Sequence, residues 1–258
     1  MPAYINTNVA SINTVRILDS SQKELTTSME RLSSGKRINH ARDDAAGMAI
    51  SSKMTSQING MNQAVRNTND GISMVQTADG AMEGIADKLQ RMRELAVQSS
   101  NGIYSSSDRA ALDIEFQALD DEINRVASSA EFNGTNLIDA DAQIDIQVSY
   151  AADSTNGKIT VSLSGVDSTD LGINANVITS QAASSTAITA VDAALSTVNS
   201  ARATLGATQN RLETTVKDLK NNVENLSASR SRIEDADFAS ETAQLAKSQI
   251  LQQAGMAM

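Results

Sequence analysis

Apolar residues between positions 188 and 233 recur at the spacing of an α-helix. The steps alternate between three and four residues, which is the heptad pattern of helices that pack as coiled coils. At about 1.5 Å per residue, the predicted helix is roughly 70 Å long. Its expected seam consists of Ile188, Val191, Leu195, Val198, Arg202, Leu205, Gln209, Leu212, Val216, Leu219, Val223, Leu226, Arg230 and Ile233.

A second apolar stripe lies in residues 54–96 and predicts a helix of similar length. It keeps the same spacing except for two consecutive steps of three residues from Ile72 to Ala78, a phase slip that indicates a local change of supercoil. A third, shorter stripe covers residues 112–126. The polar segment before it ends with Ser107 and Asp108, which are residues that favour the start of a helix.

The middle of the chain has a different periodicity. The sequences QIDIQVSY and KITVSL place apolar side chains at every second position, as a half-buried strand does. Asn156 and Gly157 lie between them, and this pair favours tight turns. A β-hairpin near residues 143–163 is therefore predicted. Residues 164–186 are rich in Ser, Thr, Ala and Asn and are interpreted as a loop.

Weaker helical stripes occupy both ends of the chain, in residues 15–32 and 238–254. Long helices that each bury only a narrow seam must pair with one another. If the chain reverses direction at the hairpin, the C-terminal helices run antiparallel to the N-terminal ones. The predicted fold is mainly α: a long, antiparallel, coiled-coil-like helical bundle with a small β-hairpin region, in which the two ends of the chain pair.

Composition narrows the range of functions. The 258 residues include no Trp, no Cys and a single Pro, so apolar seams rest on Ala, Val, Ile, Leu and Met, and almost nothing interrupts long helices. The formal net charge of -10 argues against nonspecific nucleic-acid binding, which needs a basic surface. No apolar run approaches the roughly 18 residues of a membrane span. The N-terminal sequence lacks the pattern of a cleaved signal peptide.

The segment RLSSGKRINHARDDAAGMAI, residues 31–50, concentrates charge and contains the only histidine, His40. The Gly-Lys-Arg sequence that begins at Gly35 does not match a phosphate-binding loop. His40 has no Cys and no second His as a partner, so neither a metal site nor a catalytic site is expected. Gly35 suits the end of one helix, and Asp43 and Asp44 suit the start of the next. The segment is therefore interpreted as a joint between two helical blocks.

Five segments resemble the conserved signatures of bacterial flagellins. They are MPAYINTNVASI, RLSSGKRINHARDDAAGMAIS, LQRMRELAVQSSNG, EFNGTNLI and SRIEDADFASETAQLAKSQILQQAG, and they occur in the order found in that family. The resemblance implies a structural subunit that polymerises into the flagellar filament for swimming motility. It implies no enzymatic activity and no cofactor.

The resemblance also implies a domain organisation. Residues 1–42 would form the N-terminal half of an inner helical domain and the joint, residues 43–235 a core domain of long helices with the hairpin, and residues 236–258 the C-terminal half of the inner domain. Larger flagellins insert outer domains in the middle, where this chain offers only residues 164–186, so it resembles a minimal form. Family members continue beyond the QQAG segment, so the C-terminal half of the inner domain is expected to be curtailed, which bears on polymerisation and on binding of the export chaperone.

Two groups of surface residues follow from the resemblance. The charged joint residues are candidates for contacts between subunits: Arg31, Lys36, Arg37, Arg42, Asp43 and Asp44. On the long helices, four residues match the patch that the flagellin-sensing Toll-like receptor recognises: Gln90, Arg91, Leu95 and Glu115. Helical spacing places Leu95 among polar residues on an outer face, and the alternatives are packing against the helix of residues 112–126 or an exposed leucine without a function.

The implied partners are other copies of this chain in a helical homopolymer, the flagellar export chaperone, cap or junction proteins, and the host Toll-like receptor. Neither nucleic acid nor membrane insertion is expected. Export by the flagellar type III apparatus would place the protein outside the cell, in the filament. Two alternatives are a hook-filament junction protein and a truncated flagellin fragment that does not polymerise. An enzyme built on residues 31–50 would require an activity that is sensitive to His40→Ala.

Overall fold

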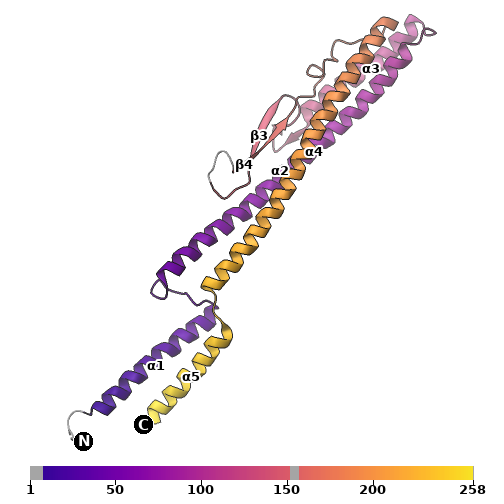
Figure 1. Ribbon diagram of the computed structural model, residues 1–258. Coiled ribbons are helices and arrows are strands. Elements are labelled where there is room, and N and C mark those ends of the chain that lie inside the picture. Colours follow the sequence, from indigo (N-terminus) through magenta and orange to yellow (C-terminus); the bar gives the residue numbers. More distant parts are fainter. Residues whose placement is uncertain (1–7, 152–156, 258) are drawn as a thin grey trace. The chain divides into compact units, whose positions relative to one another are not determined.

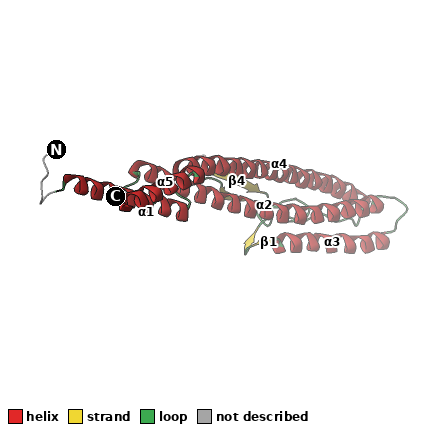
Figure 2. Cartoon of the chain, turned by 90° about the horizontal axis from the view of Figure 1, so that it is seen from below, coloured by secondary structure: helices red, strands yellow, loops and turns green. Residues whose placement is uncertain are grey.

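The computed structural model describes residues 8–151 and 157–257 and consists mostly of long helices (Figure 1; Figure 2). The helices are α1 (Val9–Ser34), α2 (Ala45–Ser99), α3 (Ser106–Ser129), α4 (Gln181–Glu234) and α5 (Phe238–Ala257). The strands are β1 (Glu131–Phe132), β2 (Thr135–Asn136), β3 (Ala142–Gln147) and β4 (Lys158–Leu163). The predicted mainly α fold with a small β region is confirmed.

The described chain divides into two compact units. The first unit combines residues 8–59 with residues 222–257, and the second unit spans residues 60–221. The division falls inside α2 and α4, whereas the sequence placed the domain boundaries at the joint, after residues 42 and 235. The apolar spacing of both helices continues through the observed boundaries, so the sequence pattern contains no signal there.

The second unit has a continuous apolar core. It is formed by α2, α3, α4 and the β3–β4 hairpin, and α2, α3 and α4 lie side by side at this level (Figure 1). Burying one large apolar side chain contributes roughly 1.5–3 kcal/mol, so this core is the main source of stability in the unit. Its large, fully buried side chains include Met82, Ile85, Leu89, Met92, Phe116, Ile123 and Leu205.

The seam of α4 differs in detail from the predicted one. Ala187, Ala194 and Ala201 are buried, whereas Ile188 and Leu195 lie half-buried beside them. The small residues at the centre of the seam let the neighbouring helices approach, and the larger ones cover its edge. The polar residues that seemed to interrupt the predicted stripe, such as Arg202, therefore flank the seam instead of lying within it.

The predicted β-hairpin is present. Strands β3 and β4 pair antiparallel, with Ala142 opposite Leu163 and Gln147 opposite Lys158. Along β4, Ile159, Val161 and Leu163 are buried and the residues between them are exposed, as the period-2 pattern requires. Of the predicted turn, Asn156 lies outside the described residues.

A second and shorter hairpin, between β1 and β2, was not predicted. Asn133 and Gly134 form its turn with φ angles of 51° and 77°, both in the left-handed region. Two such residues in succession are the requirement of a type I′ hairpin turn, which Asn-Gly meets at low cost. The signal was present in the sequence EFNGTN, but the strands on either side are too short to show an alternating pattern.

Two element boundaries differ from the sequence predictions. The predicted loop of residues 164–186 ends at Ser180, because α4 begins at Gln181 and its first turns are anchored by buried Ser184. At the start of α3, the capping residue is Ser105 and not Ser107. The Ser105 side chain accepts from the Asp108 N–H, and the Asp108 carboxylate accepts from the Ser105 N–H, which is a capping box.

In the first unit, α1 and α5 lie side by side (Figure 1). Arg31 lies 3.7 Å from Glu241, and Gln22, further from the joint, contacts Gln252. One helix therefore runs opposite to the other, and the predicted pairing of the two ends of the chain is confirmed.

Candidate functional site

The interface between α1 and α5 combines buried small polar residues with half-buried leucines such as Leu18 and Leu25. Ser21, Ser28 and Ser248 are the buried side chains of the pair, with Ser248 completely buried. The Cα atoms of the two helices approach within 8 Å, which such small side chains permit. The Ser248 hydroxyl has no hydrogen-bond partner among the described residues. Because its leucines are only half-buried, each of them contributes less hydrophobic free energy than a fully buried leucine does.

Large apolar side chains of the same two helices are exposed instead. Val9 is 68% exposed and Ile250 is 66% exposed. Single exposed apolar residues are ordinary, but a concentration of them marks a surface that associates with another molecule. We call the exposed large apolar side chains of these two helices the apolar face of the α1–α5 pair, a name for the whole set and not for one side of a helix: Val9, Ile12, Val15, Ile17, Met29, Phe238, Ile250, Leu251 and Met256.

The joint begins where Gly35 ends α1. Gly35 has a φ of 71°, a left-handed conformation, and donates its N–H to the Arg31 carbonyl oxygen at 2.9 Å. This is the helix end that the sequence predicted. At the other side of the joint, the Asp44 carboxylate accepts from the Gly47 N–H at 2.8 Å and so caps α2.

Asp43 has a different role from the predicted helix cap. Its Oδ2 atom accepts from the backbone N–H groups of His40, at 2.9 Å, and Asn39, at 3.1 Å. The hydrogen bond from the His40 N–H is the main reason that the pKa of Asp43 lies below its usual range, followed by the bond from Asn39 and the nearby Arg42. Asp43 therefore closes the turn before α2, and only Asp44 acts at the start of the helix.

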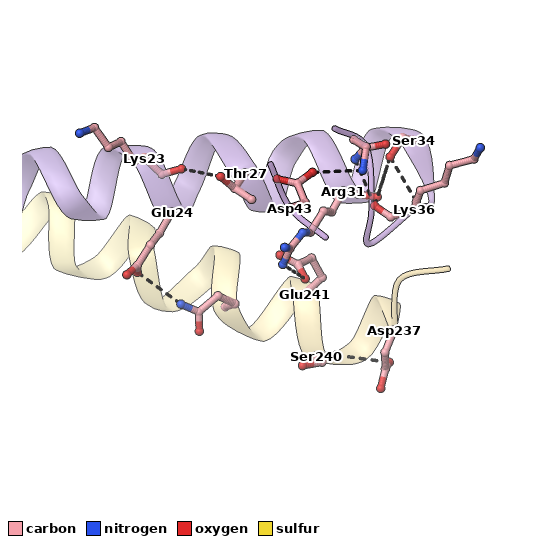
Figure 3. A network of polar contacts seen from close by, with 12 residues as sticks. Lys23, Glu24, Thr27, Arg31, Ser34, Lys36, Asp43, Asp237, Ser240 and Glu241 are labelled. Atoms are coloured by element: carbon pink, nitrogen blue, oxygen red, sulfur yellow. Dashed lines mark hydrogen bonds and ion pairs between the residues drawn. The ribbon is translucent and has the colours of Figure 1, made fainter. Parts of the chain in front are cut away.

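The basic residues of the joint have partners within the chain. Lys36 Nζ lies 2.5 Å from Glu234 Oε1 at the end of α4, and Arg37 donates to the Ile233 carbonyl oxygen at 2.6 Å. Figure 3 shows Arg31 of α1 directed toward Glu241 of α5. The role of these side chains in contacts between subunits stays a prediction. In such a contact, each of them would bind a neighbouring subunit in addition to its partner within the chain.

Glu234 is the centre of these contacts. Besides the ion pair with Lys36, it accepts from the Ser51 hydroxyl at 2.5 Å. Lys36 and then Ser51 lower the pKa of Glu234, so the carboxylate is ionised at neutral pH. One carboxylate therefore connects the start of α2, the end of α4 and the joint.

His40 lies in this joint and contacts a carboxylate of α1. Its Nε2 atom lies 2.7 Å from Glu30 Oε1 of α1, and the imidazole is about half exposed. In residues 8–151 and 157–257, no group of three or more His, Cys, Asp or Glu could hold a metal ion. Across the same residues, every helix is too short or too polar to span a bilayer.

The second candidate surface lies on α2 and α3. Arg91 donates its Nε to Glu115 of α3 at 2.9 Å and its Nη1 to Glu94 at 3.0 Å. The bond to Glu115 is the larger cause of a raised pKa for the Arg91 guanidinium. Gln90 is exposed beside this pair. The structure therefore brings three of the four predicted patch residues together at the surface.

Leu95, the fourth residue, is not at the surface. It is 0% exposed and belongs to the core of the second unit, so the prediction of an outer-face leucine is wrong. The reason is that α2 is covered on two faces at this level, by α4 and by α3. The alternative interpretation, packing against the helix of residues 112–126, agrees with this burial.

Sequence comparisons identify related proteins. The bacterial flagellin N-terminal helical region matches residues 5–143, and the bacterial flagellin C-terminal helical region matches residues 188–258. A flagellin of Halalkalibacterium halodurans is 45% identical over 256 residues, which cover 98% of this chain and 93% of that protein.

Other relatives are much longer. A flagellin of Shigella flexneri is 46% identical over 72% of this chain but 34% of its own length. Flagellin A of Vibrio anguillarum is 53% identical over 54% of this chain and 36% of its own length. The chain thus matches about a third of the length of these two relatives.

Solved structures agree with these matches. The crystal structure of Bacillus cereus flagellin has a TM-score of 0.54 and 32% identity, over 64% of this chain and 94% of that chain. A putative flagellar hook-associated protein from Vibrio parahaemolyticus has a TM-score of 0.62 over 75% of this chain and all of that chain, but at 12% identity this likeness shows the fold alone. The two family regions and the relative that matches along nearly its whole length show that this chain belongs to the bacterial flagellin family.

Proposed function

We propose that this chain is a structural subunit that polymerises into the extracellular flagellar filament and so serves swimming motility, after export by the flagellar type III apparatus. The observation that carries the proposal is the apolar face of the α1–α5 pair, which is exposed among the described residues. Membership of the flagellin family supports the same function.

Polymerisation follows from burial of that face by other copies. Each square ångström of apolar surface removed from water contributes about 25 cal/mol, so many small contacts repeated along a polymer are sufficient to hold it together. If the contacting surfaces are different patches of the subunit and the rotation between copies does not close, the product is an open filament and not a ring.

Electron microscopy of concentrated or salted-out protein tests the proposal. The chain should form long helical filaments, and the double variant Ile12→Gln, Val15→Gln should form none while its monomer melts at the wild-type temperature. Ile103→Gln is the matched control, because Ile103 is 81% exposed in the second unit and lies outside the apolar face. Filaments of the double variant at the wild-type protein concentration would contradict the role of the apolar face.

Soluble monomers of the unmodified chain under all these conditions would overturn the proposal. They would favour one of the two alternatives, a truncated fragment that does not polymerise or a hook-filament junction protein. The likeness to the hook-associated protein concerns the fold alone and so does not favour the second of these.

Charge reversal in the joint tests whether it also contacts neighbouring subunits. Arg37→Glu should impair filament growth while leaving the monomer folded, since the Arg37 side chain is about half exposed and its contacts among the described residues, with the Ile233 carbonyl oxygen and with Asp44, lie at the surface of the joint. Circular dichroism of the monomer separates the two effects. Growth at the wild-type rate would restrict Arg37 to its internal contact.

Recognition by the host Toll-like receptor is a second candidate function, and the exposed Arg91–Glu115 pair with the neighbouring Gln90 is the observation that favours it. Arg91→Ala should abolish signalling in a reporter cell line with intact receptor. Arg93→Ala is the matched control, because Arg93 lies on the same helix, is equally exposed and bonds to Asp192 instead. Equal signalling by both variants and the unmodified protein would contradict recognition through this patch.

A further inference from the structure

The chain contains four Asn-Gly pairs, and one of them lies in the turn between α2 and α3. The pairs begin at Asn59, Asn101, Asn133 and Asn156. In any Asn-Gly sequence the glycine nitrogen can attack the asparagine side-chain amide, because glycine has no side chain to hinder the approach. The rate depends on whether the structure presents the two groups to one another.

Asn101 folds its side chain toward the glycine. Its Oδ1 atom accepts from the Ile103 N–H at 3.3 Å, which closes the side chain over the intervening Gly102 backbone, as in an Asx turn. The same hydrogen bond polarises the side-chain carbonyl group. It lies where a donor stabilises the negative charge that develops on Oδ1 when a nucleophile attacks Cγ.

The peptide group that joins Asn101 to Gly102 is polarised as well. Its carbonyl oxygen accepts from Arg109 Nη2 at 3.0 Å and from the Tyr104 N–H at 3.4 Å. A second guanidinium bond, from Arg109 Nε to the Ser99 carbonyl oxygen at 2.8 Å, fixes the position of the cation. A cation on the carbonyl oxygen stabilises the anion that forms when the N–H of the same peptide group loses its proton.

The nucleophile itself is free. The Gly102 N–H donates to no acceptor in the described parts of the chain. Gly102 is exposed, and a Cβ built on it would have nothing within 4 Å. The backbone around the glycine can therefore make the small rotation that ring closure requires, and solvent base can reach the proton.

We propose that Asn101-Gly102 is an autocatalytic deamidation site. Solvent base removes the proton of the Gly102 N–H, and the nitrogen forms a bond to Asn101 Cγ. The bond from Cγ to Nδ2 breaks, and the departing nitrogen takes a proton from water and leaves as ammonia. Water then opens the resulting succinimide at either carbonyl group and yields aspartate or isoaspartate. No oxidant, reductant or enzyme takes part.

Two of the other pairs lack these features. Asn59-Gly60 lies inside α2, where the glycine N–H is held by the helical hydrogen-bond pattern and the backbone cannot rotate. Asn133-Gly134 lies between the paired strands β1 and β2, which restrain the turn on both sides. These two pairs therefore serve as references within the same molecule.

Peptide mapping by mass spectrometry tests the proposal. The full chain is incubated at mildly alkaline pH, once folded and once in urea, and conversion is measured at each Asn-Gly pair. In urea the pairs should react at similar rates. In the folded protein, Asn101 should react faster than in urea while Asn59 becomes much slower. Slower reaction of Asn101 in the folded protein than in urea would overturn the proposal.

Arg109→Gln separates activation by the guanidinium from simple exposure. It should slow conversion of Asn101 about tenfold or more in the folded protein, the effect of losing one hydrogen bond to a charged donor, and leave the rate in urea unchanged. An unchanged or faster rate in the folded variant would contradict activation by Arg109. If this variant fails to fold, the comparison of folded and unfolded wild-type protein still decides.

Discussion

The second unit of this flagellin and the α1–α5 pair of the first unit bury different kinds of side chain, although both are built from helices with coiled-coil spacing. The second unit buries Met, Leu, Ile and Phe side chains in a continuous core. In the α1–α5 pair of the first unit, the buried side chains are serines, the leucines between the helices are half-buried, and other large apolar side chains are exposed.

Helical periodicity alone therefore does not tell which residues a subunit buries by itself. The same spacing occurs in a seam that is buried within one chain and in a surface that is buried only when another molecule binds. The burial of large apolar side chains in the second unit implies that core substitutions act on folding of that unit, whereas under the proposed function substitutions of exposed residues in α1 and α5 should act on association.

The largest expected effect is truncation in the core of the second unit. Phe116→Ala removes a fully buried ring and should lower the free energy of unfolding by about 3–5 kcal/mol. Val15→Ala, on the exposed face of α1, should change it by less than about 0.5 kcal/mol. Urea unfolding of the monomer followed by circular dichroism measures both. Similar losses for the two variants would remove the distinction between the units.

Packing between α2 and the hairpin should give the next largest effect. A Cβ at Gly71 would overlap Ile146 Cδ1, so Gly71→Ala forces the isoleucine to move and should cost about 1–3 kcal/mol. Gly80→Ala is the control in the same helix. A Cβ there meets open space, and alanine should stabilise the helix by about 0.5–1 kcal/mol. Thermal unfolding of the two variants should therefore shift in opposite directions.

Asp120 of α3 is expected to weaken the second unit at neutral pH. It is 8% exposed, its Oδ1 has no partner among the described residues, and burial raises its pKa. A raised pKa means that the group favours the folded state at low pH and that this stability is lost as the pH rises through the folded-state pKa. Asp120→Asn should therefore raise the free energy of unfolding by on the order of 1 kcal/mol at pH 7 and leave it unchanged below about pH 3. Urea unfolding over this pH range checks it, and a constant difference would contradict it.

Asp43 in the joint should stabilise the folded protein at neutral pH, which is the opposite of Asp120, and the change in the free energy of unfolding should be smaller. Its lowered pKa means that its contribution is present above the unfolded-state value and is lost as the pH falls through the folded-state value. Asp43→Asn should therefore destabilise the first unit at pH 7 and be neutral in strong acid. The backbone N–H groups of Asn39 and His40 donate hydrogen bonds to Asp43, so the rate of their hydrogen exchange measures the local loss of stability.

Much of the helical architecture was predictable because the seams are long and regular. The sequence predicted less well which residues of each helix are buried. Large residues such as Ile188 define the stripe most visibly, yet the small Ala187 lies at its centre, because close helix packing selects for volume as well as polarity. Likewise, Leu95 is buried because a third helix covers α2, which the periodicity of a single helix does not reveal.

The joint was predictable at its ends and not in its middle. Gly35 and Asp44 act through local backbone rules, which the sequence displays directly. The partners of Lys36 and Arg37 come from the end of α4, nearly two hundred residues away, and only the fold brings them close. The Arg109 contacts at Asn101 likewise depend on how the turn between two helices is arranged.

The contacts between the two halves of the chain are nested, and this has a consequence for the order of folding. Ala142 pairs with Leu163 at the centre, Arg93 with Asp192 at a separation of 99 residues, and Arg202 with Asp79 at 123. Arg230 donates a hydrogen bond to Thr55, which is 175 residues away in the sequence. Closing the shortest loop first reduces the entropy lost at each later step. We therefore expect folding to begin near the hairpin. Contacts at increasing sequence separation then form in order, so that α1 and α5 pair last.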